Sequence, residues 1–441
     1  MARIALAATT AAAAAAITAF GAEAALAPTT PVYGIAGPRP VGLVRVDPQT
    51  LRPLPGRRVP LAAHTFGWSF SPDSSKLAIG TDGSAEVRIV DLRRWRVLGD
   101  VKIGVARRRS VLATAWAGSS RVLAVVVSPG CCGLGDTTVA AIDAQRQRLL
   151  WQRRLGGSLQ DGQRFRRSLV LVLGPRGRML GPSRLALVGP DGRVRFAPLA
   201  EIRSGVHGSS TRNGRGFITD IWNPGSAVDA AGARAFVVQA GAPIAEVDLR
   251  TLRVRYHTLS QPISLLGRLH DWLEPKAEAK AGEGPTRRAL WLGQGRLAVT
   301  GTDEHASADA SGNERQWETA AGLKLIDTHR WTIRTIDSDA TSAVRVGGTL
   351  VTSSLLWDSR PGRFTGSGLT GYTLDGRRTF HRYGDDPISG TQPLGTRLLV
   401  GGAAGSRIFR LGALLDARTG RELGRVHFDV ELLAEDQSFW Y

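Results

Sequence analysis

The sequence contains very little cysteine and very little lysine. Only two of its 441 residues are cysteines, which excludes a fold held by several disulfides and a zinc site built from spaced cysteine pairs. Lysine occurs only at Lys76, Lys102, Lys276, Lys280 and Lys324, so arginine supplies nearly all of the charge behind the net value of +19. The His-Glu-x-x-His and Gly-x-Ser-x-Gly signatures and a phosphate-binding glycine loop are also missing. No known catalytic motif therefore indicates an enzyme.

Long apolar runs are missing except at the N-terminus. Arg3 precedes an alanine-rich apolar stretch from Ile4 to Phe20, and Ala22-Glu23-Ala24 fits a small-x-small cleavage site. We therefore predict a signal peptide over residues 1–27, a single domain over 28–441, and a protein that is secreted or associated with the cell envelope. An uncleaved membrane anchor is the alternative, and only that form would contact a membrane.

What the sequence does contain is a regular series of short strands and turns. Between His64 and Lys102, the turn sequences Ser71-Pro72-Asp73-Ser74 and Asp82-Gly83 and a third turn at Asp91 separate four predicted strands. Apolar residues alternate within these strands, as a half-buried strand requires. Four antiparallel strands in about 40 residues are the size of one blade of a β-propeller.

The aspartate that begins the last of these turns recurs along the chain, most often at a spacing of about 50 residues. Its carboxylate can accept hydrogen bonds from the backbone N–H groups of the turn. The eight turns begin at Asp47, Asp91, Asp143, Asp191, Asp248, Asp327, Asp375 and Asp416. They predict an all-β fold, a single β-propeller of four-stranded antiparallel blades, with eight blades favoured over seven. The blades are expected at residues 32–60, 64–102, 115–154, 162–199, 226–257, 288–336, 342–383 and 393–428.

The first predicted blade, residues 32–60, has only three strands. The C-terminal residues 432–441 lie beyond the last outer strand, Glu422 to Phe428, and end in the aromatic sequence Ser438-Phe439-Trp440-Tyr441. Aromatic residues favour strands. We predict that this segment pairs with the first blade, so that the N- and C-terminal segments close the ring.

Two segments carry a resemblance to a known family. The sequences SPDSSKLAIG…VRIVDL, from Ser71, and AVDAAGARAFVV…IAEVDLRT, from Ala227, are similar to WD-repeat and YVTN-type β-propellers of bacterial secreted proteins. The resemblance implies the fold over nearly the whole mature chain. It leaves the function open, because that superfamily binds proteins, carbohydrates and small ligands and sometimes catalyses.

Three inserts interrupt the repeats, and long inserts in a propeller commonly carry function. Residues 204–223 are expected to be a connecting loop, 270–285 to begin as a short helix, and 303–319 to form a polar hairpin. The third insert has side-chain oxygens at Asp303, Glu304, Asp309, Asn313 and Glu314. These oxygens suit Ca²⁺, but their spacing matches no EF-hand loop, and a solvated loop is the favoured interpretation. No metal or other cofactor is predicted.

Many of the arginines lie on the predicted outer strands. Charge on an exposed edge strand prevents pairing with other molecules, so the arginine excess has a structural explanation. The sequence also lacks the aromatic motifs of RNA-binding modules. We therefore expect no nucleic-acid partner and a monomeric protein.

The two cysteines, Cys131 and Cys132, are adjacent and can pair only with each other or with another molecule. Adjacent Cα atoms lie about 3.8 Å apart, below the usual disulfide range, so such a ring forces a tight turn. The pair is similar to that of the propeller-type pyrroloquinoline quinone dehydrogenases, although no other residue matches. A disulfide that holds one loop rigid is the favoured interpretation.

Five residues are the best candidates for a ligand pocket. His64 and Trp68, and likewise Asp220, Trp222 and Asn223, precede or begin an inner strand of a predicted blade. In propellers this region faces the axis; the alternative is that the aromatic residues belong to the core and the aspartate caps a turn. We favour a non-enzymatic binding protein for a carbohydrate, a small ligand or a partner protein of the envelope. The alternative is a propeller enzyme: a lyase, a hydrolase or a quinone-dependent dehydrogenase.

Overall fold

The computed structural model describes most of the chain: residues 32–37, 41–48, 50–61, 65–81, 83–104, 109–127, 135–210, 217–259, 282–308, 314–404, 406, 408, 411–427 and 430–433. These residues form strands, turns and connecting segments, with no helix among them. Within the same residues, accordingly, no helix is long and apolar enough to cross a membrane. The all-β prediction is confirmed.

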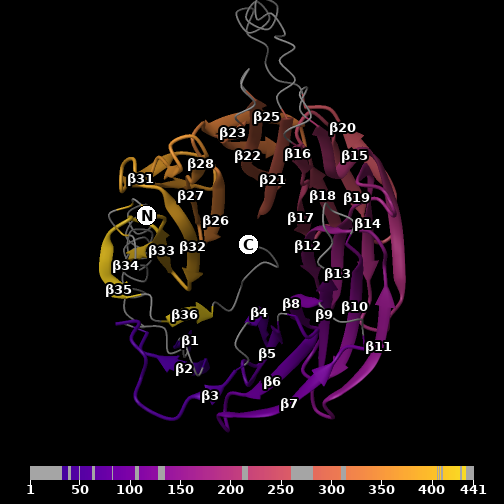
Figure 1. The fold of residues 1–441 in the computed structure, drawn as a ribbon, viewed down its shortest axis with the longest axis vertical. Helices are drawn as coiled ribbons and strands as arrows, with labels where there is room; N and C mark the ends of the chain where they lie inside the picture. The colour runs from indigo at the N-terminus through magenta and orange to yellow at the C-terminus, as the bar shows by residue number, and fades with distance from the viewer. Residues whose placement is uncertain are drawn as a thin grey trace, which may run out of the picture.

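The described strands form antiparallel sheets arranged in a ring, which is the architecture of a β-propeller (Figure 1). Eight sheets are present in the described part of the chain. The first sheet contains β1 (Val32–Ala36), β2 (Gly42–Val46), β3 (Val59–Pro60) and β36 (Val430–Leu433), and the second contains β4 (Thr65–Phe70), β5 (Lys76–Thr81), β6 (Glu86–Asp91) and β7 (Arg96–Lys102). The third sheet contains β8 (Ser110–Trp116), β9 (Arg121–Val127), β10 (Thr137–Asp143) and β11 (Arg148–Arg154). The fourth sheet has five strands: β12 (Leu159–Phe165), β13 (Ser168–Leu173), β14 (Leu180–Val188), β15 (Val194–Ser210) and β16 (Phe217–Trp222).

The other four sheets complete the described ring. The fifth sheet contains β17 (Gly225–Asp229), β18 (Arg234–Val238), β19 (Ile244–Asp248) and β20 (Val254–His257). The sixth sheet has seven strands: β21 (Gly282–Gly293), β22 (Arg296–Ala308), β23 (Glu314–Ala320), β24 (Leu323–Asp327), β25 (Thr332–Asp337), β28 (Leu356–Asp358) and β29 (Arg363–Thr365). The seventh sheet contains β26 (Ser342–Val346), β27 (Thr349–Ser353), β30 (Leu369–Thr373) and β31 (Arg378–Arg382), and the eighth contains β32 (Ile388–Leu394), β33 (Arg397–Gly402), β34 (Leu411–Asp416) and β35 (Glu422–His427). β4 to β7 are the four strands predicted between residues 64 and 102.

The core lies between neighbouring sheets, and the middle strands are buried on both faces. In β9, Val122, Ala124 and Val126 pack toward the β4–β7 sheet. Leu123 and Val125 of the same strand pack toward the β12–β16 sheet. Burial on both faces explains why this strand is a continuous apolar run rather than an alternating one. The β8–β11 sheet therefore depends on both of its neighbours for its core.

The turn aspartates act as the sequence predicts at seven of the eight positions. Asp248 Oδ1, for example, accepts hydrogen bonds from the backbone N–H groups of Arg250 at 2.8 Å and Thr251 at 2.9 Å. The corresponding bonds occur at Asp47, Asp91, Asp143, Asp191, Asp327 and Asp416. At Asp375 the carboxylate accepts a hydrogen bond from the hydroxyl group of Thr373 instead.

Arginine side chains connect neighbouring sheets. At three positions the first residue of the second strand donates to a carbonyl oxygen in a turn of the next sheet: Arg121 to Pro190 at 2.7 Å, Arg296 to Leu374 at 3.5 Å, and Arg397 to Pro48. Arg195 and Arg382 make similar bonds to the carbonyl groups of Arg250 and Gly420. The arginine excess thus has a second structural role besides charging the exposed outer strands.

A strand near the C-terminus completes the first sheet. β36 pairs with β1, with Tyr33 opposite Leu433 and Ala36 opposite Val430. The prediction from sequence assigns this pairing to residues 432–441, on the basis of their aromatic end. The paired strand instead begins at Val430, which follows the outer strand directly, and residues 434–441 lie outside the described part of the chain.

The inserts differ from their predictions in two places. Residues 204–223 form not a simple loop but part of a hairpin, because β15 extends to Ser210 and pairs with β16. Asp303 to Thr319 is the predicted hairpin, β22 with β23. Its edge adds β28 and β29 from the neighbouring repeat, which the sequence did not predict. In the segment 270–285, the residues of the predicted short helix lie outside the described part of the chain, and the glycine-rich end, residues 282–285, belongs to β21. The third blade begins at Ser110 rather than Ala115.

Candidate functional site

The predicted pocket residues lie in two separate parts of the ring. Trp68 is on β4 and only 8% exposed, in the core between the β1–β3–β36 and β4–β7 sheets. Its indole N–H is buried and has no hydrogen-bond partner among the described residues. Trp222 is on β16, on the opposite side of Figure 1. The structure therefore does not bring Trp68 and Trp222 together.

Trp222 and Asn223 are half-buried where β16 meets β21. The backbone N–H of Asn223 donates to the carbonyl oxygen of Pro285 at 3.1 Å, and the N–H of Arg287 donates to the carbonyl oxygen of Asn223 at 2.8 Å. These two bonds form a short parallel bridge with Thr286. Asp220 lies in β16 opposite His207, but its side chain is outside the described part of the structure, as are His64, Cys131 and Cys132.

A polar cluster lies beside this crossing, on the strands nearest the centre of the ring (Figure 1). We call it the axial cluster and define it as Asp161 and Gln163 of β12, Ser226 of β17 and Arg288 of β21. The carboxylate of Asp161 accepts hydrogen bonds from the hydroxyl group of Ser226 at 2.8 Å, from the backbone N–H of Ser226 and from the N–H of Gly162 at 2.8 Å. Gln163 donates to the carbonyl oxygen of Ser226 at 3.2 Å.

Burial sets the charge state of Asp161. Loss of hydration raises the pKa of this carboxyl group to about 6, although its bonds to Ser226 and Gly162 and the nearby Arg288 favour the charged form. The Arg288 side chain is exposed. Asp161 can therefore gain or lose a proton near neutral pH while a cation faces it, which suits the recognition of a polar ligand.

A second charged group lies one residue along β21. Arg287 forms an ion pair with Asp303 at 2.8 Å and donates to the carbonyl oxygens of Thr286 and Thr302. Lys324 stands nearby, and burial followed by the charge of Arg287 lowers its pKa. Asp303, one of the side-chain oxygens considered for Ca²⁺, is thus paired with Arg287. Among the described residues, no group of three His, Cys, Asp or Glu side chains could hold a metal ion.

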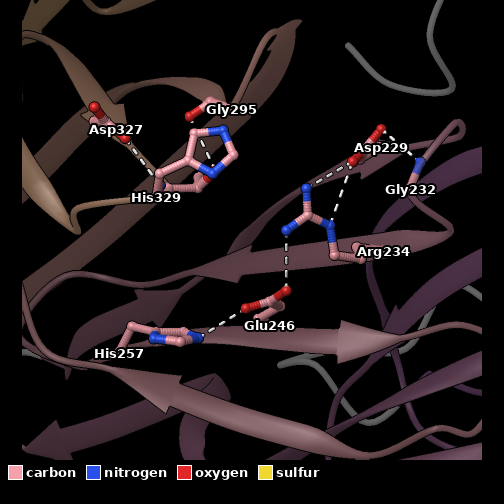
Figure 2. Close-up of polar contacts among 9 residues, drawn as sticks. Asp229, Gly232, Arg234, Glu246, His257, Gly295, Asp327 and His329 are labelled. Carbon is pink, nitrogen blue, oxygen red and sulfur yellow. Dashed lines mark hydrogen bonds and ion pairs between the residues drawn. The ribbon is translucent and has the colours of Figure 1, made fainter.

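A longer charged network runs across β17, β18, β19 and β20 (Figure 2). Arg234 pairs with Asp229 at 2.9 Å and with Glu246 at 3.3 Å, and His257 contacts Glu246 at 2.8 Å. The His257 ring stacks on Trp331 of the next sheet, with the ring centroids 3.5 Å apart. These charged groups satisfy one another within the β17–β20 sheet, and the stacking of His257 on Trp331 joins that sheet to the next one. The network therefore stabilises the packing of the two sheets rather than offering a ligand site.

The sequence analysis missed Asp161, Gln163, Ser226 and Arg288. One signal was present: Gln160-Asp161-Gly162-Gln163 is a polar run on an inner strand, where the other inner strands are largely apolar or small. The meaning of that run depends on Ser226 and Arg288, which come from other repeats.

Known proteins resemble this chain in structure and not in sequence. No protein-family model matches it, and no curated protein matches it. The structure of dihydro-heme d1 dehydrogenase NirN in complex with DHE is 13% identical, covers 91% of this chain and 74% of its own, and has a TM-score of 0.54. BamB from Moraxella catarrhalis is 13% identical, covering 83% of this chain and 92% of its own, with a TM-score of 0.41. The Dos1 propeller is 10% identical, covering 84% and 91%, with a TM-score of 0.44. The chain is a β-propeller. At identities this low the likeness extends to the fold alone.

Proposed function

We propose that the protein is an extracytoplasmic, non-enzymatic binding protein whose axial cluster recognises a carbohydrate or another small polar ligand. The observation that carries the proposal is the Asp161 carboxyl group, poised between its charged and neutral forms beside the exposed Arg288. A neutral carboxyl donates a hydrogen bond and a carboxylate accepts one, while the guanidinium group donates in either state. Sugar hydroxyl groups satisfy both kinds of partner.

Calorimetric titration with a panel of neutral and acidic sugars tests this proposal. Arg288→Gln should weaken the binding of any sugar that binds by at least tenfold, because an exposed cation is lost without disturbing the core. Arg255→Gln is the matched control: it removes an exposed arginine on the outer strand β20. Equal binding by the wild type and Arg288→Gln would reject the axial cluster as the site.

We further propose that the eight sheets are eight blades of one closed ring. What supports it is the pairing of β36 with β1 and the packing of Val44 and Val46 against Leu399 and Leu414 of the last sheet. The bond from Arg397 to Pro48 joins the same two sheets. A ring in which every sheet has two neighbours leaves no face of the first or last sheet without a partner.

The export and disulfide predictions rest on sequence. N-terminal sequencing of protein from its native host should begin near Ala25, and a mature chain that starts at Met1 would contradict export. Unreduced mass spectrometry should find the peptide that contains Cys131 and Cys132 two hydrogens lighter than its dithiol form. Thiol labelling of both residues in freshly secreted protein would argue against the ring.

A further inference from the structure

Two arginine side chains converge on a single carbonyl oxygen. Arg176 Nη2 donates to the carbonyl oxygen of Leu155 at 2.8 Å. Arg184 Nη2 donates to the same oxygen at 2.5 Å and to the carbonyl oxygen of Gly156 at 2.7 Å. One shared acceptor places the two guanidinium groups side by side.

The backbone of this site is built to present those oxygens. Residues 155–157 connect β11 to β12, and Gly156 and Gly157 have φ angles of 69° and 74°, a left-handed conformation that glycine adopts without strain. A Cβ atom on Gly156 would lie 2.8 Å from Nε of Arg176. A side chain at position 156 would therefore crowd the Arg176 guanidinium group.

Nothing anionic in the described structure balances the two cations. No ion pair joins Arg176 or Arg184 to a carboxylate among the described residues, and Nε of Arg184 is buried without an acceptor there. Burial, and then the charge of Arg176, lower the pKa of Arg184. The Arg184 guanidinium lies over the Phe196 ring, 4.7 Å from its centroid, which fixes its plane. Carbonyl dipoles alone leave a double positive charge partly desolvated.

We propose that Arg176 and Arg184 form a binding site for a phosphate-type oxyanion, either free phosphate or the phosphate group of a small metabolite. A pair of planar guanidinium groups matches the geometry of phosphate oxygens. Arg176 is exposed and Arg184 half-buried, so the site has one side open to an incoming anion. Bound there, the anion joins the β8–β11 sheet to the β12–β16 sheet. The site is separate from the axial cluster and does not depend on it.

Calorimetric titration of the full-length protein with inorganic phosphate and with glucose 6-phosphate, at constant ionic strength, tests the proposal. Saturable binding is expected with at least one of them. Arg176→Gln should weaken it by tenfold or more, and because Arg176 is exposed, the variant should melt close to the wild-type temperature without phosphate. Tighter binding of the sugar phosphate identifies a phosphorylated metabolite as the occupant, and equal binding identifies free phosphate.

Arg195→Gln is the matched control. Arg195 also donates to two turn carbonyl groups, those of Leu249 and Arg250, at 3.0 and 2.8 Å, but it shares neither oxygen with a second guanidinium group. The Arg195→Gln protein should therefore bind phosphate as tightly as the wild type does. The proposal fails if neither anion binds saturably, if Arg176→Gln binds as the wild type does, or if Arg195→Gln loses binding to the same extent.

Discussion

At the scale of single residues, the turns between the two outer strands contain unexpected backbone conformations. The fourth residue after the turn aspartate has a positive φ in five turns, although none of the five is glycine: Leu51, Trp95, Gln147, Leu252 and Trp331, with φ between 53° and 61°. A sixth turn has Gly420 at the same place. A left-handed residue with a side chain costs about 1–2 kcal/mol. The turn geometry therefore outweighs the preference of these side chains.

Gln147→Gly should increase the free energy of unfolding by roughly 0.5–1 kcal/mol. The substitution relieves the left-handed strain, and the gain exceeds the greater entropy of glycine in the unfolded chain. Gln147 is exposed, so little packing is lost. Gln145→Gly in the same turn is the control and should lower stability, because that residue has no positive φ. Chemical denaturation measures both, and a less stable Gln147→Gly protein would contradict the argument.

The raised pKa of Asp161 makes stability depend on pH in a defined direction. The folded state binds a proton more tightly than the unfolded state, whose carboxyl pKa is near 3.8. The contribution of Asp161 is therefore most favourable below pH 4 and is lost as pH rises from about 4 to about 6, by roughly 3 kcal/mol at most.

Asp161→Asn should remove that pH-dependent loss. The unfolding free energies of the wild type and the variant are measured from pH 4 to pH 7. The difference between them should change from about pH 4 to about pH 6 and become constant at higher pH. Ser226→Ala is a useful companion, because it removes a hydrogen bond to the carboxylate and should shift the window upward. Parallel pH profiles for the wild type and Asp161→Asn would show that the carboxyl group does not titrate there.

The residue pattern identified Trp68 and Trp222 as candidate pocket residues, but it could not show which of them is buried in the core. Trp68 and Trp222 both occupy positions near inner strands, yet one is core and the other half-buried at a strand crossing. The difference arises from neighbours far away in sequence, such as Leu433 beside Trp68 and Thr286 beside Asn223. Periodicity within one repeat carries no information about contacts between repeats.

At the scale of elements, turn chemistry and alternation located most strands, since both signals are local. The exceptions are instructive. The glycine- and serine-rich stretch 204–223 has the composition of a loop. Its N-terminal part nevertheless continues β15, which pairs with Leu180 to Ser183 of β14 on one side and with β16 on the other. β28 and β29 are three residues each and join a sheet that belongs to the neighbouring repeat. Elements stabilised by a partner strand rather than by their own pattern are not visible in the sequence.

The arginines that connect neighbouring sheets should be worth more than exposed arginines. Arg397→Met keeps much of the side-chain length and removes the bond to Pro48. Hydrogen bonds from charged groups contribute about 1.5–3 kcal/mol, so a loss of that size in the free energy of unfolding is expected. Arg255→Met on β20 should change it by less than about 0.5 kcal/mol. Equal losses in urea denaturation would refute a special role for Arg397.

At the scale of the whole molecule, two truncations separate the described closing strand from the residues after it. A chain that ends at Leu433 keeps β36, whereas a chain that ends at Asp429 loses it, together with the buried Leu433, which is 3% exposed. The free energy of unfolding of the shorter chain should fall by about 2–5 kcal/mol from the loss of the buried leucine. The first sheet would also keep an unpaired inner edge. Calorimetric melting distinguishes the two, and equal melting temperatures would contradict closure of the ring by β36.

The pairing of β36 with β1 also determines the order of events during synthesis. β1 is made before all the other described strands and its partner β36 after them, so the edge of β1 stays open while those strands emerge. Joining two ends separated by nearly the whole chain carries a large entropic cost, and contacts of this kind form slowly. Until they form, β1 can accept a strand from another chain. A growing polypeptide of this protein is thus most vulnerable to aggregation just before β36 appears.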